Sequence, residues 1–301
     1  RDHCVTGVQT CALPIWMSAD GNFSTAANWQ PNGIPGEADT VRLSSGFLNL
    51  DIDSRISSLE MTGGILQGSG KLEILTSAIW TGGDINEGDT LLIAPFATLE
   101  IDGSQKDLNS TTLINNGLVN WNGDGRISLK NHAAIINNGN FYLNGDALLD
   151  YVLPDSGGSF INNDSLIKSG SGTSTIDAEF YQSGVIHVQS GKLRFERGNG
   201  IAIGGNLHIE PNAIAEFDER TFEIDSLHVS GGGIIRGHVL SFAKGARARV
   251  QSRVGIGVRD LDALEKHVAA RAISGEGPRM EAGRGIDLEL GPHARLLPVQ
   301  T

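Results

Sequence analysis

Several features that mark other classes of protein are missing from this sequence of 301 residues. It has no continuous apolar run of about 18 residues, so no helix is expected to span a membrane. Basic residues are few: there are 23 Lys and Arg against 35 Asp and Glu, which leaves a net charge of −12. Such a charge repels nucleic-acid backbones and anionic lipids, so neither is an expected partner. The hydrophobic content of 39% is nevertheless too high for a disordered chain.

Cysteine is almost absent, and both copies, Cys4 and Cys11, lie in the opening stretch RDHCVTGVQTCALPI. Residues 5–15 resemble one translated reading frame of a common sequencing adapter. We therefore interpret residues 1–15 as a non-native segment, which excludes them from the fold and leaves the natural N-terminus outside this sequence. The alternative is a genuine N-terminal arm with a disulfide between the two cysteines. Without this stretch the chain has no cysteine, so disulfide usage assigns no cellular compartment.

Turn-forming residues recur along the chain at regular intervals. Forty glycines and many asparagines separate short segments rich in Val, Ile and Leu, which predicts an all-β fold of short strands. INNG occurs at residues 114–117 and 136–139, and INND at residues 161–164. With the fourth residue as origin, copies follow at steps of 22, 25, 20, 21 and 20 residues, at Gly117, Gly139, Asp164, Gly184, Gly205 and Asp225.

Apolar residues occupy fixed positions within each copy of this repeat. Of the twelve residues two and four places after the six origins, eleven are apolar and the exception is Lys168. The residues between them vary, which is the period-two pattern of a strand with one buried face. A second pattern, apolar-x-apolar-x-x-x-Ala-x-apolar, occurs six times between Leu72 and Leu296. The repeat is therefore expected to continue to the end of the chain.

This recurrence, with Gly and Asn turns and almost no helical pattern, predicts a β-solenoid. We expect a right-handed, single-stranded parallel β-helix with coils of about 21 residues. Leucine-rich repeats share the period, but their Leu-rich consensus is missing. A β-sandwich or barrel is the alternative, although it would give alternating strands without matching columns. Asn115, Asn137 and Asn162 are expected to stack at equivalent corners as a structural ladder of amide hydrogen bonds.

The chain divides into five regions in this interpretation. The non-native residues 1–15 are followed by an N-terminal cap region at residues 16–46 and the solenoid at residues 47–250. An insertion or decoration that contains a helix is expected at residues 251–285, and a last, truncated coil at residues 286–301. The helix is predicted within DLDALEKHVAARA, where apolar residues recur at helical spacing: Leu261, Leu264, Val268 and Ala272. From Arg236 onward the composition also becomes basic, with eleven Lys and Arg against seven Asp and Glu. This basic segment has three possible interpretations: a docking patch for acidic glycans, a solvated insertion, or a frameshift.

Two stretches resemble bacterial cell-surface β-strand-repeat proteins, whose relatives include autotransporter passengers and filamentous adhesins. The frame W…NW…G-x-P-x-x-x-D-x-V is matched by Trp16, Asn28, Trp29, Gly33, Pro35, Asp39 and Val41. Residues 163–193 resemble the repeat unit N-x-G-x-x-x-K-x-G-x-G-x-S-x-I…F-x-N-x-G-x-V-x-V-x-S-G-x-L, with departures at Asp164 and Ser183. The resemblance covers residues 16 to about 242. It implies a secreted or surface-anchored stalk or adhesin.

Three histidines are candidate metal ligands. His187, His208 and His228 fall in the outward column of consecutive copies. At the ~4.8 Å spacing of stacked strands, neighbouring imidazoles can share a metal ion or titrate together near neutral pH. No nearby cysteine or paired carboxylate is expected as a further ligand. Exposed strand positions that merely tolerate a polar ring are the alternative.

A second candidate cation site follows the pattern of a calcium loop. Asn120, Asn122 and Asp124 match the first half of the loop, with Gly125 at its sixth position. The twelfth position is Asn131, whereas the loop requires a bidentate glutamate. A plain Asn-Gly turn between coils is the alternative.

Sequence signatures of enzymes are missing. No G-x-S-x-G, H-E-x-x-H, P-loop or dinucleotide-binding motif occurs. Asp51 and Asp53 share one strand face, but no further acid recurs one coil away to build the carboxylate pair of a glycosidase. We therefore expect no catalytic residue and no cofactor.

The expected function is that of a non-enzymatic adhesin or structural stalk, extracellular or on the bacterial cell surface at the outer membrane. A carbohydrate-active enzyme of β-helix fold, either a polysaccharide lyase or a hydrolase, is the alternative. The candidate partners are glycans and proteins of a host or neighbouring cell surface. Tyr142 and Trp29 are the aromatic residues expected to contact them.

Overall fold

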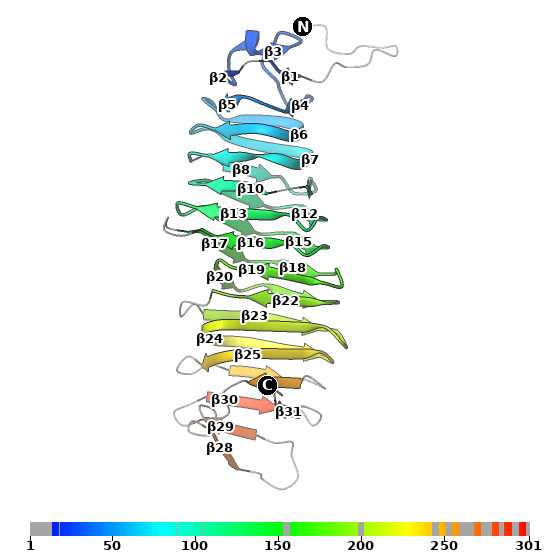
Figure 1. Cartoon of the computed structure of the whole chain (residues 1–301), viewed down its shortest axis with the longest axis vertical. Coiled ribbons are helices and arrows are strands. Elements are labelled where there is room, and N and C mark those ends of the chain that lie inside the picture. The colour runs from blue at the N-terminus through cyan, green and yellow to red at the C-terminus, as the bar shows by residue number, and fades with distance from the viewer. Residues whose placement is uncertain are drawn as a thin grey trace.

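The computed structural model is an elongated stack of β-strand coils, with the N-terminal strands at one end and the last strands at the other (Figure 1). It describes residues 14–17, 19–88, 90–103, 105–152, 157–197 and 202–242, and then six strands between residues 247 and 298. For residues 202–203, 218–226 and 237 onward only the backbone is described. The predicted all-β solenoid with coils about 21 residues apart is confirmed.

Most coils consist of three short strands, so the stack has three faces, and on each face a strand pairs in parallel with those of the adjacent coils. Face I contains β8 (Thr90–Ile93), β11 (Thr112–Asn115), β14 (Ala134–Asn137), β17 (Ser159–Asn162) and β20 (Glu179–Gln182). Face II contains β4 (Thr40–Leu43), β9 (Thr98–Ile101), β12 (Leu118–Trp121), β15 (Asn140–Leu143), β18 (Ser165–Lys168) and β21 (Val185–Val188). Face III contains β2 (Asp20–Asn22), β5 (Phe47–Asn49), β10 (Lys106–Asn109), β13 (Arg126–Lys130), β16 (Leu148–Tyr151), β19 (Thr173–Ile176) and β22 (Lys192–Phe195).

Longer strands pass from one face to the next without a break. These are β6 (Ser54–Gln67), β7 (Lys71–Asn86), β23 (Ala202–Ile209), β24 (Ile214–Gly231) and β25 (Ile234–Phe242). The strands of the C-terminal part are β26 (Arg247–Val250), β27 (Gly255–Val258), β28 (Val268–Arg271), β29 (Arg279–Ala282), β30 (Ile286–Leu290) and β31 (Arg295–Pro298). The parallel columns therefore continue past the described side chains, since β26 pairs with β30 and β27 with β31.

The N-terminal region lies at one end of the stack (Figure 1). It contains β1 (Ile15–Trp16), the short 3-10 helix η1 (Ala26–Asn28) and β3 (Trp29–Gln30), in addition to β2 and β4. Three buried aromatic rings fill it: Trp29 packs edge-to-face against Trp16 and Phe23, with ring centroids 5.1 and 5.2 Å apart. This position suits a cap that shields the core of the first coils. Cys4, Cys11 and nearly all of the non-native segment predicted at residues 1–15 lie outside the described residues.

The core is a continuous apolar column inside the three faces. Along each strand alternate residues point inward, as on β12, where Val119 and Trp121 are buried while Asn120 is not. Five aromatic rings run along this column through successive coils, because the centroids of neighbouring rings are 5.3, 5.8, 4.6 and 5.1 Å apart in the series Phe141, Phe160, Phe180, Phe195 and Phe217. Burial of each such side chain stabilises the stack by about 1.5–3 kcal/mol.

Lys168, the exception among the twelve positions that the sequence repeat predicted to be apolar, is fully buried. Its Nζ donates to the carbonyl oxygens of Gly170 at 2.7 Å and Gly145 at 3.2 Å. Burial lowers the pKa of this amine, against an opposing effect of Asp146 and Asp124. The ammonium thus replaces an apolar side chain at a corner where two backbone carbonyls point inward.

Four of the five predicted steps of the repeat are confirmed by the strand register. On face II, Leu118 pairs with Asn140, Asn140 with Ser165, Ser165 with Val185, and Val185 with Asn206. These pairs are separated by 22, 25, 20 and 21 residues, which are the spacings of the sequence repeat.

The last predicted step is wrong by two residues. Gly205 pairs with Leu227, whereas the sequence repeat placed Asp225 at the equivalent position. The pairing of β23 with β24 shifts between Ile203 and Gly205, where β24 contains one additional residue. A shift of two residues leaves every side chain on its face, and the apolar alternation therefore does not reveal it.

The helix predicted around residues 260–272 is also corrected. Val268–Arg271 form strand β28, which pairs antiparallel with β29, while residues 260–267 lie outside the described part of the chain. At Val268–Arg271, pairing with β29 satisfies the backbone, so tertiary pairing overrides the helical pattern in these four residues.

Candidate functional site

Two of the three predicted histidines form a pair on face II. His187 of β21 and His208 of β23 are direct neighbours in the parallel ladder. Both occupy outward positions, because the residues that flank them, such as Ile186 and Leu207, are fully buried. The two imidazole rings meet edge-to-face with centroids 4.9 Å apart. The coils that contain β21 and β23 therefore stack in the predicted register, and the two rings are in contact.

The third member of the cluster is Glu210, which the sequence analysis missed. It lies two residues after His208, so strand alternation places both side chains on the same face. Glu210 begins a tight turn after β23: its N–H donates to Val188 O at 2.9 Å, and its carbonyl accepts from Ala213 N at 3.0 Å. The turn holds Glu210 Oε1 3.1 Å from His187 Nε2 and 3.3 Å from His208 Nε2.

This single carboxylate is a possible ligand that the sequence analysis did not include. The signal in the sequence was the pair H-x-E at His208 and Glu210, since residues at i and i+2 of a strand share a face. The possible ligand atoms of His187, His208 and Glu210 all lie within 4.8 Å of one another, and no other such group of three occurs among the residues described.

Ser230 fixes the orientation of one ring. It pairs with His208 across the β23–β24 ladder, and its Oγ lies 2.8 Å from His208 Nδ1. Nε2 of His208 is therefore the nitrogen directed toward Glu210. A hydrogen bond of this kind to the second ring nitrogen is the usual support of a metal-binding histidine.

The charge and the exposure of the cluster suit an ion from solvent. The hydrogen bond from His187, followed by the charge of His208, lowers the pKa of Glu210 below its ordinary value, against an opposing effect of burial. The carboxylate is thus ionised at neutral pH. The side chains of His187, His208 and Glu210 are 29%, 39% and 42% exposed, so water and ions reach all three.

His228, the third predicted histidine, is not part of this cluster. It pairs with Asn206, two residues before His208. The cause is the register shift at Ile203 and Gly205, which places Ser230 where the sequence repeat had placed His228. In place of the predicted three histidines, the cluster contains His187, His208 and the carboxylate of Glu210.

The predicted calcium ligands lie on β12 and in the turn that follows it. The amide groups of Asn120 and Asn122 donate to the two carboxylate oxygens of Glu100 at 2.7 and 2.6 Å. Asp124 Oδ1 accepts the backbone N–H of Asp146 at 2.9 Å. These polar groups are thus engaged in contacts between coils, and calcium binding stays a prediction.

The three asparagines of the expected ladder lie at equivalent corners inside the stack, where face I ends. Asn115 Nδ2 donates to Asn137 Oδ1 and Asn137 Nδ2 to Asn162 Oδ1, each at 2.7 Å. Asn162 in turn donates to Gln182 Oε1 at 2.7 Å, which adds a residue that the sequence repeat did not indicate. All of these amides are buried, so the ladder joins coils and does not contact solvent.

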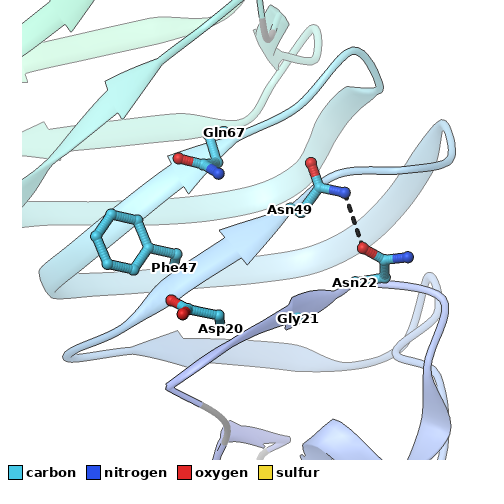
Figure 2. A pocket seen from close by; sticks show the side chains of 6 residues that line it. All are labelled: Asp20, Gly21, Asn22, Phe47, Asn49 and Gln67. Carbon is cyan, nitrogen blue, oxygen red and sulfur yellow. Dashed lines mark hydrogen bonds between the residues drawn. The ribbon is translucent and has the colours of Figure 1, made fainter.

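A second surface feature is a shallow open depression on face III near the N-terminal end, with a volume of about 370 Å³, lined by Asp20, Gly21, Asn22, Phe47, Asn49 and Gln67. Figure 2 shows Phe47 beside Asp20, and the amides of Asn22, Asn49 and Gln67 along the neighbouring column. Asn49 Nδ2 donates to Asn22 Oδ1 at 2.8 Å. The Phe47 ring is 44% exposed. An aromatic face thus lies next to several planar polar groups.

Of the two aromatic residues expected to contact a partner, Trp29 is buried and is not available for stacking. Tyr142 is half-buried on the outward side of β15. Phe47 has an exposed ring that the sequence analysis had not selected, because its position alone did not distinguish it from a core residue.

Comparison of the chain with protein-family models, with curated proteins and with solved structures found no match. In the part of the chain that the structure describes, no helix is long and apolar enough to cross a membrane.

Proposed function

We propose that this chain is a non-enzymatic β-solenoid of the bacterial cell surface or the extracellular space, which acts as a structural stalk and binds glycans as an adhesin. The observation that carries this proposal is the continuous parallel pairing of the strands of face II from β4 to β24. Each coil contacts mainly its neighbours, so the fold sets a length and presents its side walls at a fixed spacing.

The depression near the N-terminal end supports glycan binding. A sugar ring has an apolar face and a rim of hydroxyl groups, and sites that bind it combine an aromatic ring with a few oriented polar groups. Phe47 supplies the exposed ring here, while Asn22, Asn49 and Gln67 supply amides that both donate and accept. Asp20 adds a carboxylate beside the ring.

The test is a panel of immobilised polysaccharides, with retention of the protein and release of reducing ends measured in the same wells. Retention without release is the expected result. Release of reducing ends would instead favour the carbohydrate-active enzyme, and a failure of both readouts would contradict the adhesin.

A matched pair of variants assigns the binding surface. Phe47→Ala is expected to reduce retention at least about tenfold, because a buried stacking contact contributes on the order of 1.4 kcal/mol or more. Tyr181→Ala removes a ring of nearly equal exposure, 42% against 44%, from another face. It is expected to leave retention unchanged. An equal loss in both variants would contradict the assignment to the depression.

A further inference from the structure

The outward side of face II brings two imidazoles and a carboxylate together from adjacent coils. From this arrangement we propose that His187, His208 and Glu210 bind one zinc ion, with water in the fourth position. The two imidazole nitrogens and the carboxylate oxygen are the donor set that zinc takes in sites with three protein ligands. The inference does not depend on the proposed glycan binding and concerns a different face of the molecule.

The distances suit such an ion. Zinc binds imidazole nitrogen at about 2.0–2.1 Å and carboxylate oxygen at about 2.0–2.2 Å, so two ligands of a tetrahedral site lie about 3.3 Å apart. Glu210 Oε1 lies 3.1 Å from His187 Nε2 and 3.3 Å from His208 Nε2. All three atoms fall within 4.8 Å of one another. The remaining gap would be closed by rotation of the His187 ring, which is 29% exposed, while Ser230 holds the His208 ring.

Ser230 accommodates the proton change that zinc binding requires. When Nε2 of His208 carries the imidazole proton, it faces the Glu210 carboxylate, and Nδ1 can accept from the Ser230 hydroxyl. With zinc on Nε2, the proton of neutral imidazole lies on Nδ1 and is donated to Ser230 Oγ. A hydroxyl both donates and accepts, so the 2.8 Å contact between His208 Nδ1 and Ser230 Oγ suits both states.

The ligands also select the class of ion. Imidazole favours zinc and its transition-metal neighbours, whereas calcium and magnesium prefer all-oxygen sites. An ion held by His187 and His208 would join the coil of β21 to the coil of β23, in addition to the backbone ladder between them. Zinc should therefore raise the thermal stability of the solenoid.

The first experiment is calorimetric titration of metal-free protein with zinc chloride at pH 7.5. The full chain is used with Cys4→Ser and Cys11→Ser, so that no thiolate competes for the ion. We expect one zinc per chain and a rise in Tm on zinc addition, with no comparable rise for calcium or magnesium. Cobalt(II) in place of zinc should give the visible absorption of a tetrahedral site.

Variants separate this site from its alternatives. His208→Ala and Glu210→Gln should weaken zinc binding at least about tenfold, while Ser230→Ala should weaken it about 10–100-fold by releasing the ring. The matched control is His228→Ala, which removes the histidine that the register places outside the cluster and should leave binding unchanged. Circular dichroism and thermal unfolding without zinc verify that each variant is folded.

Two results would overturn the proposal. One is equal zinc affinity in the parent protein and in a folded His208→Ala variant, since binding would then lie elsewhere. The other is an absence of zinc binding by the parent protein, which would leave a hydrogen-bonded cluster without a metal. Neither result bears on glycan retention, so the two proposals fail separately.

Discussion

Asn137 and Asn162 occupy equivalent corners of consecutive coils, and Nδ2 of Asn137 donates to Oδ1 of Asn162 at 2.7 Å. The same Nδ2 lies 3.0 Å from Ser165 O, while Oδ1 of Asn137 accepts from Asn115. Both asparagines are fully buried. Each amide in this ladder therefore satisfies polar groups on the coils before and after its own, which couples the stability of three coils.

Asn137→Ala should lower the free energy of unfolding by roughly 2–4 kcal/mol, because it leaves buried groups on two neighbouring coils without their partners. Urea denaturation followed by circular dichroism measures the change. Asn138→Ala is the matched control. This exposed neighbour donates to Asn116 Oδ1 at 2.9 Å, and its loss should cost less than about 1 kcal/mol, since water replaces the partner. Equal effects of the two substitutions would contradict the coupling role of the buried ladder.

Lys168→Met should leave the protein at least as stable as the parent at pH 7. The apolar side chain fills a similar volume, and the two carbonyls keep other donors: Ser174 Oγ at 2.8 Å from Gly145 O and Ser190 Oγ at 3.1 Å from Gly170 O. Thermal unfolding at pH 7 measures this. A loss of more than about 1 kcal/mol would show that the ammonium stabilises the corner.

We also expect the free energy of unfolding to depend on pH through Lys168. Because burial lowers its pKa in the folded state below 10.5, the unfolded chain binds more protons between that lowered value and 10.5. Stability from this group therefore rises with pH across that window and is constant below it. The slope of Tm against pH should be smaller in Lys168→Met. Lys71→Met, at a surface residue that is 42% exposed, should leave the slope unchanged.

Gly139→Ala should destabilise the stack by roughly 1–3 kcal/mol, because the coils are too close at this corner for a methyl group. A Cβ on Gly139 would lie 2.2 Å from Gly117 O, a backbone atom that moves only if the coil moves. Gly36→Ala is the control, since its nearest contact would be Asp39 Oδ2 at 3.9 Å. Differential scanning calorimetry should show a lower Tm for the first variant only; a similar fall in both would contradict the steric explanation.

The sequence repeat was sufficient to predict the fold class and the alignment of five consecutive coils, because inward positions such as Val119, Phe141 and Leu166 are selected by burial. The repeat failed to predict the register where a coil gains residues but each side chain stays on the same face of its strand. In β24, His228 lies two residues away from its predicted partner but on the same side of the strand. The alternation of apolar residues is the same in both registers and therefore does not reveal this shift.

The candidate metal site was predictable only in part, for a related reason. The repeat aligned His187 with His208 because both flank buried positions of the same column. Glu210 was missed because it lies at the start of the turn, where the pattern of the strand ends, and Ser230 because the register slip hides it. Glu210 and Ser230 thus come from a turn and from a strand after a register shift. Alignment of the sequence repeat compares only equivalent strand positions and does not include such residues.

The buried asparagine ladder has an exposed neighbour that runs in the opposite direction. Asn137 Nδ2 donates toward the following coil, whereas the amides of Asn138 and Asn163 donate toward the preceding one, to Asn116 and Asn138. Aligned amide dipoles add up along an axis, as they do in a helix. The two ladders run in opposite directions along the axis of the stack, so the dipoles of their amides oppose each other.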